Sequence, residues 1–343
     1  MAGFSNHWKN RLIFSGSWNY SAFKTVNSVL INSYFHDYDC QYREKQYFPR
    51  MANKLSIYKR VQELRRRYCQ QAVGKDALLT ILDEAEVGEQ VYNSNAIENS
   101  TLSLDETEKI LLQVDLDRYI SERELFEAKN LARVVSYINV RAQGIPLNSE
   151  RVLLLHKMLL SNIRDDVAGR FRQSGEWVRV GNHIALDPAH IDSALSEMFV
   201  EYDASPEEHI IKRIARLHLT FERIHPFVDG NGRIGRVINN YLFVREGYVP
   251  INIKFLDRSR YYDAFNEFNA DRKTAIMEEL VGRALTNSYH KRLAYLEGKQ
   301  IVTLAEYAKQ NQISHSNLIN KAQRQTLEAF LEKGKWKIGA LPQ

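Results

Sequence analysis

Residues 225–236 read His225-Pro-Phe-Val-Asp-Gly-Asn-Gly-Arg-Ile-Gly-Arg236 and separate two segments whose apolar residues recur at helical spacing. The spacing predicts that the first helix ends near His225 and the second begins near Asn231. Between them, Gly230 and Gly232 allow the backbone to turn with its N–H groups pointing inward. The start of the second helix adds free donors and the positive end of its dipole. We therefore expect an anion-binding loop that joins two helices.

The charged side chains of this loop are suited to a nucleotide. Arg233 and Arg236 are three residues apart, so they lie on one helix face, where two guanidinium groups can clamp the outer phosphates of a triphosphate. Asp229 would repel a phosphate unless a cation lay between them, and Mg²⁺ binds through one carboxylate plus substrate phosphates and waters. His225 titrates near neutral pH and can accept a proton from an attacking hydroxyl. These residues predict phosphoryl or nucleotidyl transfer with Mg²⁺.

Each of these residues also has an ordinary structural interpretation. His225 can cap a helix, Asp229 and Gly230 can form a turn, and both arginines can lie on a solvated helix face. The combination of acid, glycines, asparagine and arginines at these spacings is not required by a structural loop. The pattern as a whole therefore favours a functional site.

The chain around the loop is predicted to be mainly α-helical. From about residue 55 onward, apolar residues recur at three- and four-residue spacing, with capping boxes at 103–106 and 121–124. Asn148 is expected to cap one helix, and Pro206 to lie at the start of the helix that leads to His225.

Two segments are predicted to form other structures: one interrupts the helical region and the other comes after it in the chain. Residues 177–184 carry β-branched side chains around Gly181-Asn182, which predicts a small β-hairpin; its free edge can hold an extended peptide, or it can be a surface decoration. Residues 301–339 predict two short helices, 304–310 and 316–322, and resemble a helix-turn-helix, with a strand or wing near 334–338. With six Lys or Arg against three Glu, this segment suits either DNA binding or a structural role.

Composition sets broad limits. The net charge of +5 is a weak basic bias that identifies no partner. Cys40 and Cys69 are too few for a disulfide framework and lack zinc-site spacing, which predicts a reducing compartment, by default the cytoplasm. No stretch approaches the roughly 18 to 20 consecutive apolar residues of a membrane span. Residues 1–50 lack the apolar block of a secretory signal and are rich in aromatics without a period, and one hypothesis is that Met51 is the true initiator.

The loop resembles the signature of Fic-domain proteins, His-x-Phe-x-Asp/Glu-Gly-Asn-Gly-Arg-x-x-Arg, and matches it at each fixed position. The resemblance extends from about residue 90 to 290 and includes Gly169-Arg-Phe-Arg172 and Tyr261-Tyr262. It implies a helical bundle in which the hairpin is a flap that positions the target. The expected layout is an extension at 1–50, N-terminal helices at 51–120, the catalytic core at 121–290 and a helix-turn-helix-like domain at 300–343.

The resemblance also implies a role for each loop residue. It assigns His225 as general base, Asp229 to Mg²⁺, and the phosphates of ATP to the remaining fixed positions: Gly230, Asn231, Gly232, Arg233 and Arg236. The usual family reaction is adenylylation, in which a Ser, Thr or Tyr hydroxyl of a protein attacks the α-phosphate. Self-modification and a homodimer are left open. Removal of AMP, transfer of another group by the same loop, and a DNA-binding regulator are the alternatives.

A second motif, Ser94-Asn-Ala-Ile-Glu98-Asn99, resembles the inhibitory signature Ser/Thr-x-x-x-Glu-Gly/Asn of the same family. The resemblance implies that Glu98 pairs with Arg236 and denies the γ-phosphate its clamp, while Ser94 steadies the helix. A solvated glutamate beside an asparagine is the structural alternative. His156 and His218 are interpreted as packed core residues.

Overall fold

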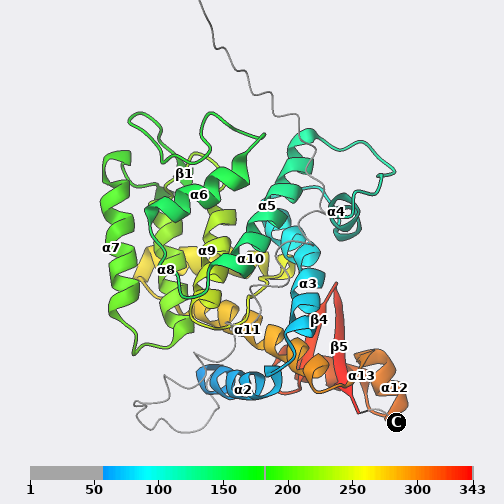
Figure 1. The fold of residues 1–343 in the computed structure, drawn as a ribbon. Helices are drawn as coiled ribbons and strands as arrows, with labels where there is room; N and C mark the ends of the chain where they lie inside the picture. The colour runs from blue at the N-terminus through cyan, green and yellow to red at the C-terminus, as the bar shows by residue number, and fades with distance from the viewer. Residues whose placement is uncertain (1–56, 181–182, 342–343) are drawn as a thin grey trace, which may run out of the picture. The chain divides into compact units, whose positions relative to one another are not determined.

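The computed structural model describes residues 57–180 and 183–341, and most of these residues are helical, as expected for a mainly α fold (Figure 1). The expectations for residues 1–50 and for Met51 lie outside the described residues. The helices that precede the C-terminal segment are α2 (Ile57–Ala72), α3 (Asp76–Ile97), α4 (Leu104–Leu111), α5 (Glu122–Arg141), α6 (Ser149–Leu160), α7 (Ile191–Ala204), α8 (Ile210–Ile224), α9 (Asn231–Arg245), α10 (Arg258–Asp271) and α11 (Ala275–Leu296), with short 3₁₀ turns η1 (Pro188–His190) and η2 (Phe255–Asp257).

Local capping fixes several helix starts where the sequence predicts them. Ser103 begins α4 with a complete capping box, and Ser121 and Asn148 cap α5 and α6 by accepting a backbone N–H. The start of α8 differs from the prediction. His209, not Pro206, is the N-cap of α8, because the His209 ring accepts the N–H of Ile211.

The core surrounds the two helices that flank the loop. α8 buries apolar side chains such as Ile214 and Phe221, and α9 buries Ile234, Ile238 and Leu242. α8 packs against α7, α9, α10 and α11, while α5 contacts α3, α6 and α9. The loop between α8 and α9 is therefore held at both ends by well-buried helices. α5 packs against both α9 and the N-terminal helix α3 (Figure 1).

The predicted hairpin is present. β1 (Arg179–Val180) pairs antiparallel with β2 (His183–Ile184), with Val180 opposite His183. Residues 181–182, where the turn is predicted, lie outside the described residues. Trp177 and Ile184 are exposed, so this short ribbon presents apolar side chains to solvent.

The C-terminal segment combines the two predicted helices with a small sheet. Its elements are β3 (Gln300–Thr303), α12 (Leu304–Gln310), α13 (His315–Gln323), β4 (Ala329–Glu332) and β5 (Lys335–Ala340), and the strands are ordered β3-β5-β4, all antiparallel. The segment has its own apolar cluster, which includes Leu304, Leu318 and Ile338. The Asn287 side chain of α11 bonds both backbone groups of Leu331 in β4, which ties the sheet to the bundle.

Cys69 is disulfide-bonded. The reducing compartment and the cytoplasmic location stay predictions. Among the described residues, no helix is both long and apolar enough to cross a membrane.

Candidate active site

His225 lies at the junction where α8 ends. It is the C-cap residue, with φ 49° and ψ 63° in the left-handed region, and its N–H bonds the carbonyl of Phe221 at 2.9 Å. Its Nδ1 lies 3.3 Å from the carbonyl oxygen of Glu222. Because a carbonyl only accepts, Nδ1 carries the proton and the lone pair of Nε2 is left to act as a base. Burial lowers the pKa of His225 to about 4, so the ring is neutral at pH 7.

A buried arginine holds this junction against the flap. Arg172 donates to four carbonyl oxygens: those of His225 at 2.8 Å, Ile224 at 3.3 Å, Glu176 at 2.9 Å and Leu186 at 2.7 Å. Its own N–H bonds the carbonyl of Pro226 at 2.9 Å. Glu176 and Leu186 lie on either side of the hairpin, so one guanidinium joins both ends of the flap to the backbone of the general-base candidate.

His156 supports the middle of the loop from α6. Its Nδ1 accepts the N–H of Gly169 at 3.0 Å, and its Nε2 lies 3.0 Å from the carbonyl of Asp229, to which it donates. The ring stacks on Phe227 with centroids 3.6 Å apart. Burial lowers the pKa of His156 to about 4, which keeps the neutral tautomer that these two bonds require. His156 is buried as predicted, but it also fixes the conformation of the loop.

Asn231 closes the loop through its side chain. The amide oxygen accepts the N–H of Phe227 at 2.9 Å, and the amide nitrogen donates to the carbonyl of the same residue at 2.8 Å. Both polar groups of the side chain are thereby used inside the loop. A phosphate can meet the backbone at the start of α9, where Gly230 has φ 84°.

Glu98 lies at the end of the loop where α9 begins. Its Oε1 accepts from Nη2 of Arg236 at 2.9 Å, and a Cβ added to Gly232 would overlap this carboxylate. Ser94 contacts the same arginine directly, since its hydroxyl accepts from Nε at 2.9 Å and its carbonyl from Nη2 at 2.8 Å. The Tyr261 hydroxyl lies 3.2 Å from Nη1. The buried guanidinium of Arg236 is thus surrounded by partners from α3 and α10.

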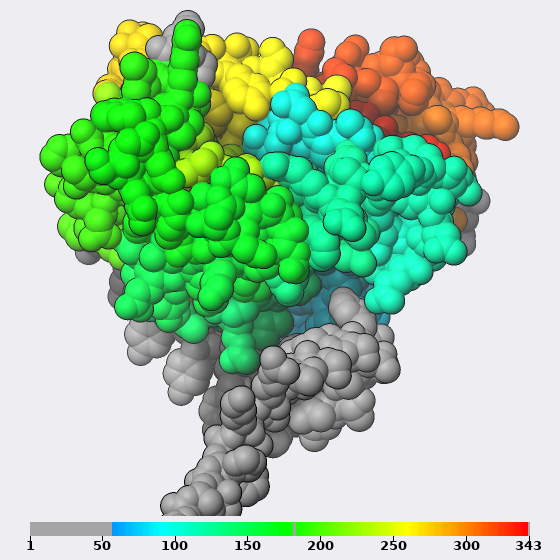
Figure 2. All heavy atoms as spheres, turned by 90° about the horizontal axis from the view of Figure 1, so that it is seen from above, coloured from blue at the N-terminus to red at the C-terminus, as the bar shows by residue number. Residues whose placement is uncertain are grey.

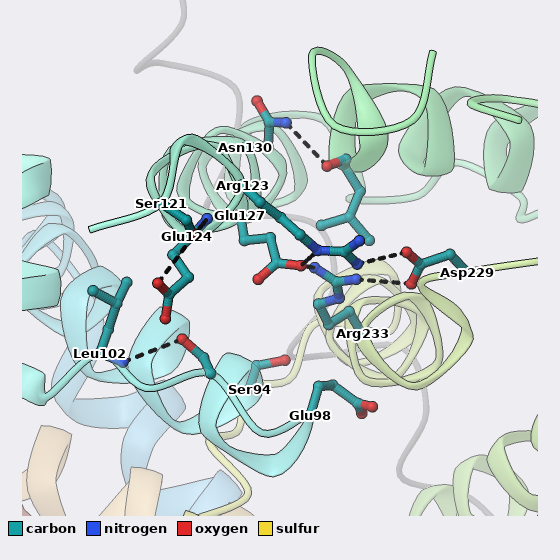
Figure 3. Close-up of polar contacts among 12 residues, drawn as sticks. Ser94, Glu98, Leu102, Ser121, Arg123, Glu124, Glu127, Asn130, Asp229 and Arg233 are labelled. Atoms are coloured by element: carbon teal, nitrogen blue, oxygen red, sulfur yellow. Dashed lines mark hydrogen bonds and ion pairs between the residues drawn. The ribbon is translucent and has the colours of Figure 1, made fainter. Parts of the chain in front are cut away.

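Asp229 and Arg233 belong to a second charged network, which reaches α5 (Figure 3). Arg123 Nη2 lies 2.7 Å from one oxygen of Asp229, and Arg233 Nη2 lies 3.2 Å from the other. Glu127 joins the two arginines, at 3.1 Å from Arg123 and 3.0 Å from Arg233. Arg233 and Arg236, predicted to form one clamp, have different partners here. Glu98, Arg123, Glu127, Asp229 and Arg233 all line one pocket.

Residues 146–243 match the model of the Fic/DOC family. The chain contains a Fic domain. The protein adenylyltransferase Fic of Drosophila melanogaster is 33% identical over 180 residues, which cover 51% of this chain and 36% of that relative. The chain therefore matches little more than a third of the length of this curated relative.

Solved Fic structures share the fold. A Fic domain containing signaling protein from Bacteroides thetaiotaomicron has a TM-score of 0.64 at 20% identity, covering 70% of this chain and 98% of that chain. Fic-1 from C. elegans has a TM-score of 0.60 at 24% identity, covering 69% of this chain and 70% of that chain. At these identities the likeness concerns the fold.

The matched Fic domain contains the loop, but several residues that organise it were not identified from the sequence. Arg123 and Glu127 precede the domain and carry no motif, so only the folded chain brings them to Asp229. Arg172 belongs to a segment noted for its resemblance, without a role. His156 lies on an apolar helix, where a histidine is usually a core residue, so the sequence gives it no role in the loop.

Proposed function

We propose that the Fic domain transfers AMP from ATP to a hydroxyl group of a protein. The observation that carries the proposal is the arrangement of one loop, with a neutral His225 whose Nε2 is available at one end and the start of α9 with Arg236 at the other. The relative's name, protein adenylyltransferase, supports the choice of AMP.

In the proposed reaction, His225 Nε2 accepts the proton of the target hydroxyl as its oxygen attacks the α-phosphorus of ATP. The new oxygen–phosphorus bond forms while the bond from the α-phosphorus to the bridging oxygen breaks, and pyrophosphate leaves. The free N–H groups of α9 bind the phosphates. Arg236 is placed to bind the terminal phosphate once Glu98 is displaced.

Asp229 is the residue proposed to hold Mg²⁺. It offers a hard carboxylate oxygen beside the anion-binding backbone, although no group of three or more His, Cys, Asp or Glu side chains with metal-site geometry occurs within residues 57–180 and 183–341. The donor set therefore fits an ion completed by substrate phosphates and water. When bound, such an ion supplies positive charge that offsets the charge of the phosphates.

The hairpin is proposed to hold the target as an added strand. Its strands are only two residues each, so backbone pairing to a target segment would be short. Because Arg172 joins the ends of the flap to His225, a target seated on the flap is held at a fixed position relative to the base.

Glu98 is proposed to inhibit the transfer. Its carboxylate forms an ion pair with Arg236 and lies against Gly232. It therefore occupies the place proposed for a phosphate of ATP. The site becomes competent when α3 releases Glu98.

The proposal is tested with ATP labelled on either the α- or the γ-phosphate. AMP transfer places only the α-label on a target or on the protein itself, and His225→Ala abolishes it. A γ-label on the acceptor would indicate phosphate transfer, and release of AMP from a pre-modified target would indicate removal. With the Glu98→Gly protein, absence of the α-label both from that protein and from every protein incubated with it would refute adenylylation.

DNA binding by residues 301–339 is a second candidate function. The observation in its favour is that α13, placed beside a small sheet, presents Asn317, Asn320 and Lys321 to solvent. Two basic residues of this segment are already paired, Lys333 of the β4–β5 turn with Glu108 and Lys337 of β5 with Glu332. DNA binding through the other basic residues of this segment should weaken steeply with salt and vanish on deletion of 301–343. DNA binding that survives the deletion would exclude this segment as the DNA-binding site.

A further inference from the structure

The contact between Arg123 and Asp229 joins two elements that are distant in sequence. Arg123 lies in the first turn of α5, whose N-cap Ser121 accepts the N–H of Glu124. From there its Nη2 reaches Asp229 Oδ2 at 2.7 Å (Figure 3). Asp229 is the residue proposed above to hold the divalent cation. The N-terminal turn of α5 therefore places the guanidinium of Arg123 on the proposed metal ligand.

The two arginines on Asp229 differ in how firmly they are held. The Arg233 side chain is 4% exposed and also binds Glu127, so it forms part of the packed site. The Arg123 side chain is 52% exposed. Exposed ion pairs contribute little to stability and are weakened by salt, so Arg123 is the partner that can be displaced.

Departure of Arg123 leaves no buried charge without a partner. Glu127, which Arg123 contacts at 3.1 Å, keeps its bond to Arg233 at 3.0 Å. Asp229 keeps Arg233 on its other oxygen at 3.2 Å. The network therefore loses one exposed arm and retains its buried half.

Arg123 and a divalent cation exclude each other at Asp229. A metal ion on Oδ2 would lie within a few ångströms of a guanidinium that is already 2.7 Å from that oxygen. Two positive charges at that separation repel strongly in a half-buried site.

We propose that Arg123 occupies the position of the divalent cation on Asp229 in the resting protein and must leave before the cation binds. The inference rests on the proposed function, since it concerns the same site. Glu98 and Arg123 then form a matched pair: the carboxylate stands where a phosphate would bind, and the guanidinium stands where the metal would bind. Both come from helices that precede the Fic domain, and in Figure 2 the cyan and teal residues of these helices lie directly beside the green residues of that domain.

The test is calorimetric binding of a non-hydrolysable ATP analogue to proteins that carry Glu98→Gly, so that the phosphate position is open. Binding is measured with Mg²⁺ and again with EDTA, in the Glu98→Gly protein and in Glu98→Gly/Arg123→Gln. Loss of the competing guanidinium should strengthen binding of the Mg²⁺ complex by about two- to fivefold, the range expected for an exposed ion pair. Binding without metal should not become tighter.

The control is Glu98→Gly/Arg141→Gln, which removes an exposed arginine from the last turn of the same helix. It should bind like the Glu98→Gly protein. Unchanged or weaker binding of the Mg²⁺ complex on loss of Arg123, or an equal gain with and without metal, would overturn the inference while leaving AMP transfer intact. Failure of the Glu98→Gly protein to bind the analogue under either condition would overturn the nucleotide site and the inference together.

Discussion

Glu98 Oε1 lies 2.9 Å from Arg236 Nη2 and joins the end of α3 to the first turn and a half of α9. Arg236 is also bound by Ser94 through both a hydroxyl and a carbonyl. Residues 94–98 therefore make three hydrogen bonds to the arginine, and removal of Glu98 alone leaves the two from Ser94. This geometry allows the acidic group to be deleted without disordering the guanidinium.

Arg172→Gln should impair target use more than nucleotide use. The substitution removes the donors that join Leu186 and Glu176 of the flap region to the carbonyl of His225. We expect a loss of about 3 kcal/mol in unfolding free energy and a larger increase in KM for the protein target than for ATP. Steady-state kinetics with each substrate varied provides the measurement. Equal effects on the two KM values would contradict a positioning role for Arg172, and recovery by Arg172→Lys would support it.

His156→Phe should retain the stack on Phe227 and lose both hydrogen bonds. The Gly169 N–H and the Asp229 carbonyl would be left unpaired, at about 1–3 kcal/mol for each buried group. The loop should then bind Mg²⁺-ATP more weakly. Thermal unfolding and analogue binding measure the two effects. His156→Gln, which can still donate and accept, should recover part of each; a Phe variant that binds like wild type would contradict the role.

Glu222→Gln should remove a pH dependence of stability. Burial raises the pKa of Glu222 to about 8, with the Glu98 charge adding to the shift and Arg236 opposing it. The pKa is higher in the folded than in the unfolded state, so the contribution is present at low pH and is lost as pH rises from about 4.5 to 8. At pH 8 the Gln variant should therefore unfold at a temperature about 2 °C or more above wild type.

The control for Glu222→Gln is the unfolding temperature of the variant and of wild type at pH 5. There the wild-type carboxyl is protonated in the folded protein, so the advantage of glutamine should shrink. Glu222 lies near His225, with Oε2 3.8 Å from Nδ1, and an added Cβ at Gly235 would overlap its other oxygen. A difference between variant and wild type that is constant from pH 5 to pH 8 would show that Glu222 is ionised throughout.

The sequence predicted the elements that depend on local chemistry. The end of α8 and the start of α9 follow from His225 and Gly230. α12 has the predicted bounds because Thr303 and Glu306 form a capping box. The sequence does not predict β3 and β4, which are four residues each. β3 pairs with a part of β5 that is distant in the chain, whereas β4 joins β5 through a two-residue turn at 333–334. The domain boundaries stay a prediction.

The residues of the site likewise divide into those that the sequence predicts and those that only the folded chain brings together. The loop residues are neighbours in sequence, and Glu98 was expected to meet Arg236 through a resemblance to a known motif. Arg123 and Asp229 are 106 residues apart and share no motif. Arg172 bonds backbone carbonyls only, so no pattern of side chains marks its partners. Long-range contacts of this kind depend on the packing of the helices.

The most direct test of the central claim is the initial rate of AMP transfer by Glu98→Gly relative to wild type, measured with α-labelled ATP. Glu84→Gly, the same substitution at an exposed position of α3, is the matched control. If the Glu98–Arg236 contact holds the Fic domain inactive, Glu98→Gly should be faster by roughly tenfold or more, the value of a charged hydrogen bond, and Glu84→Gly should match wild type. Equal rates for all three proteins would contradict the claim.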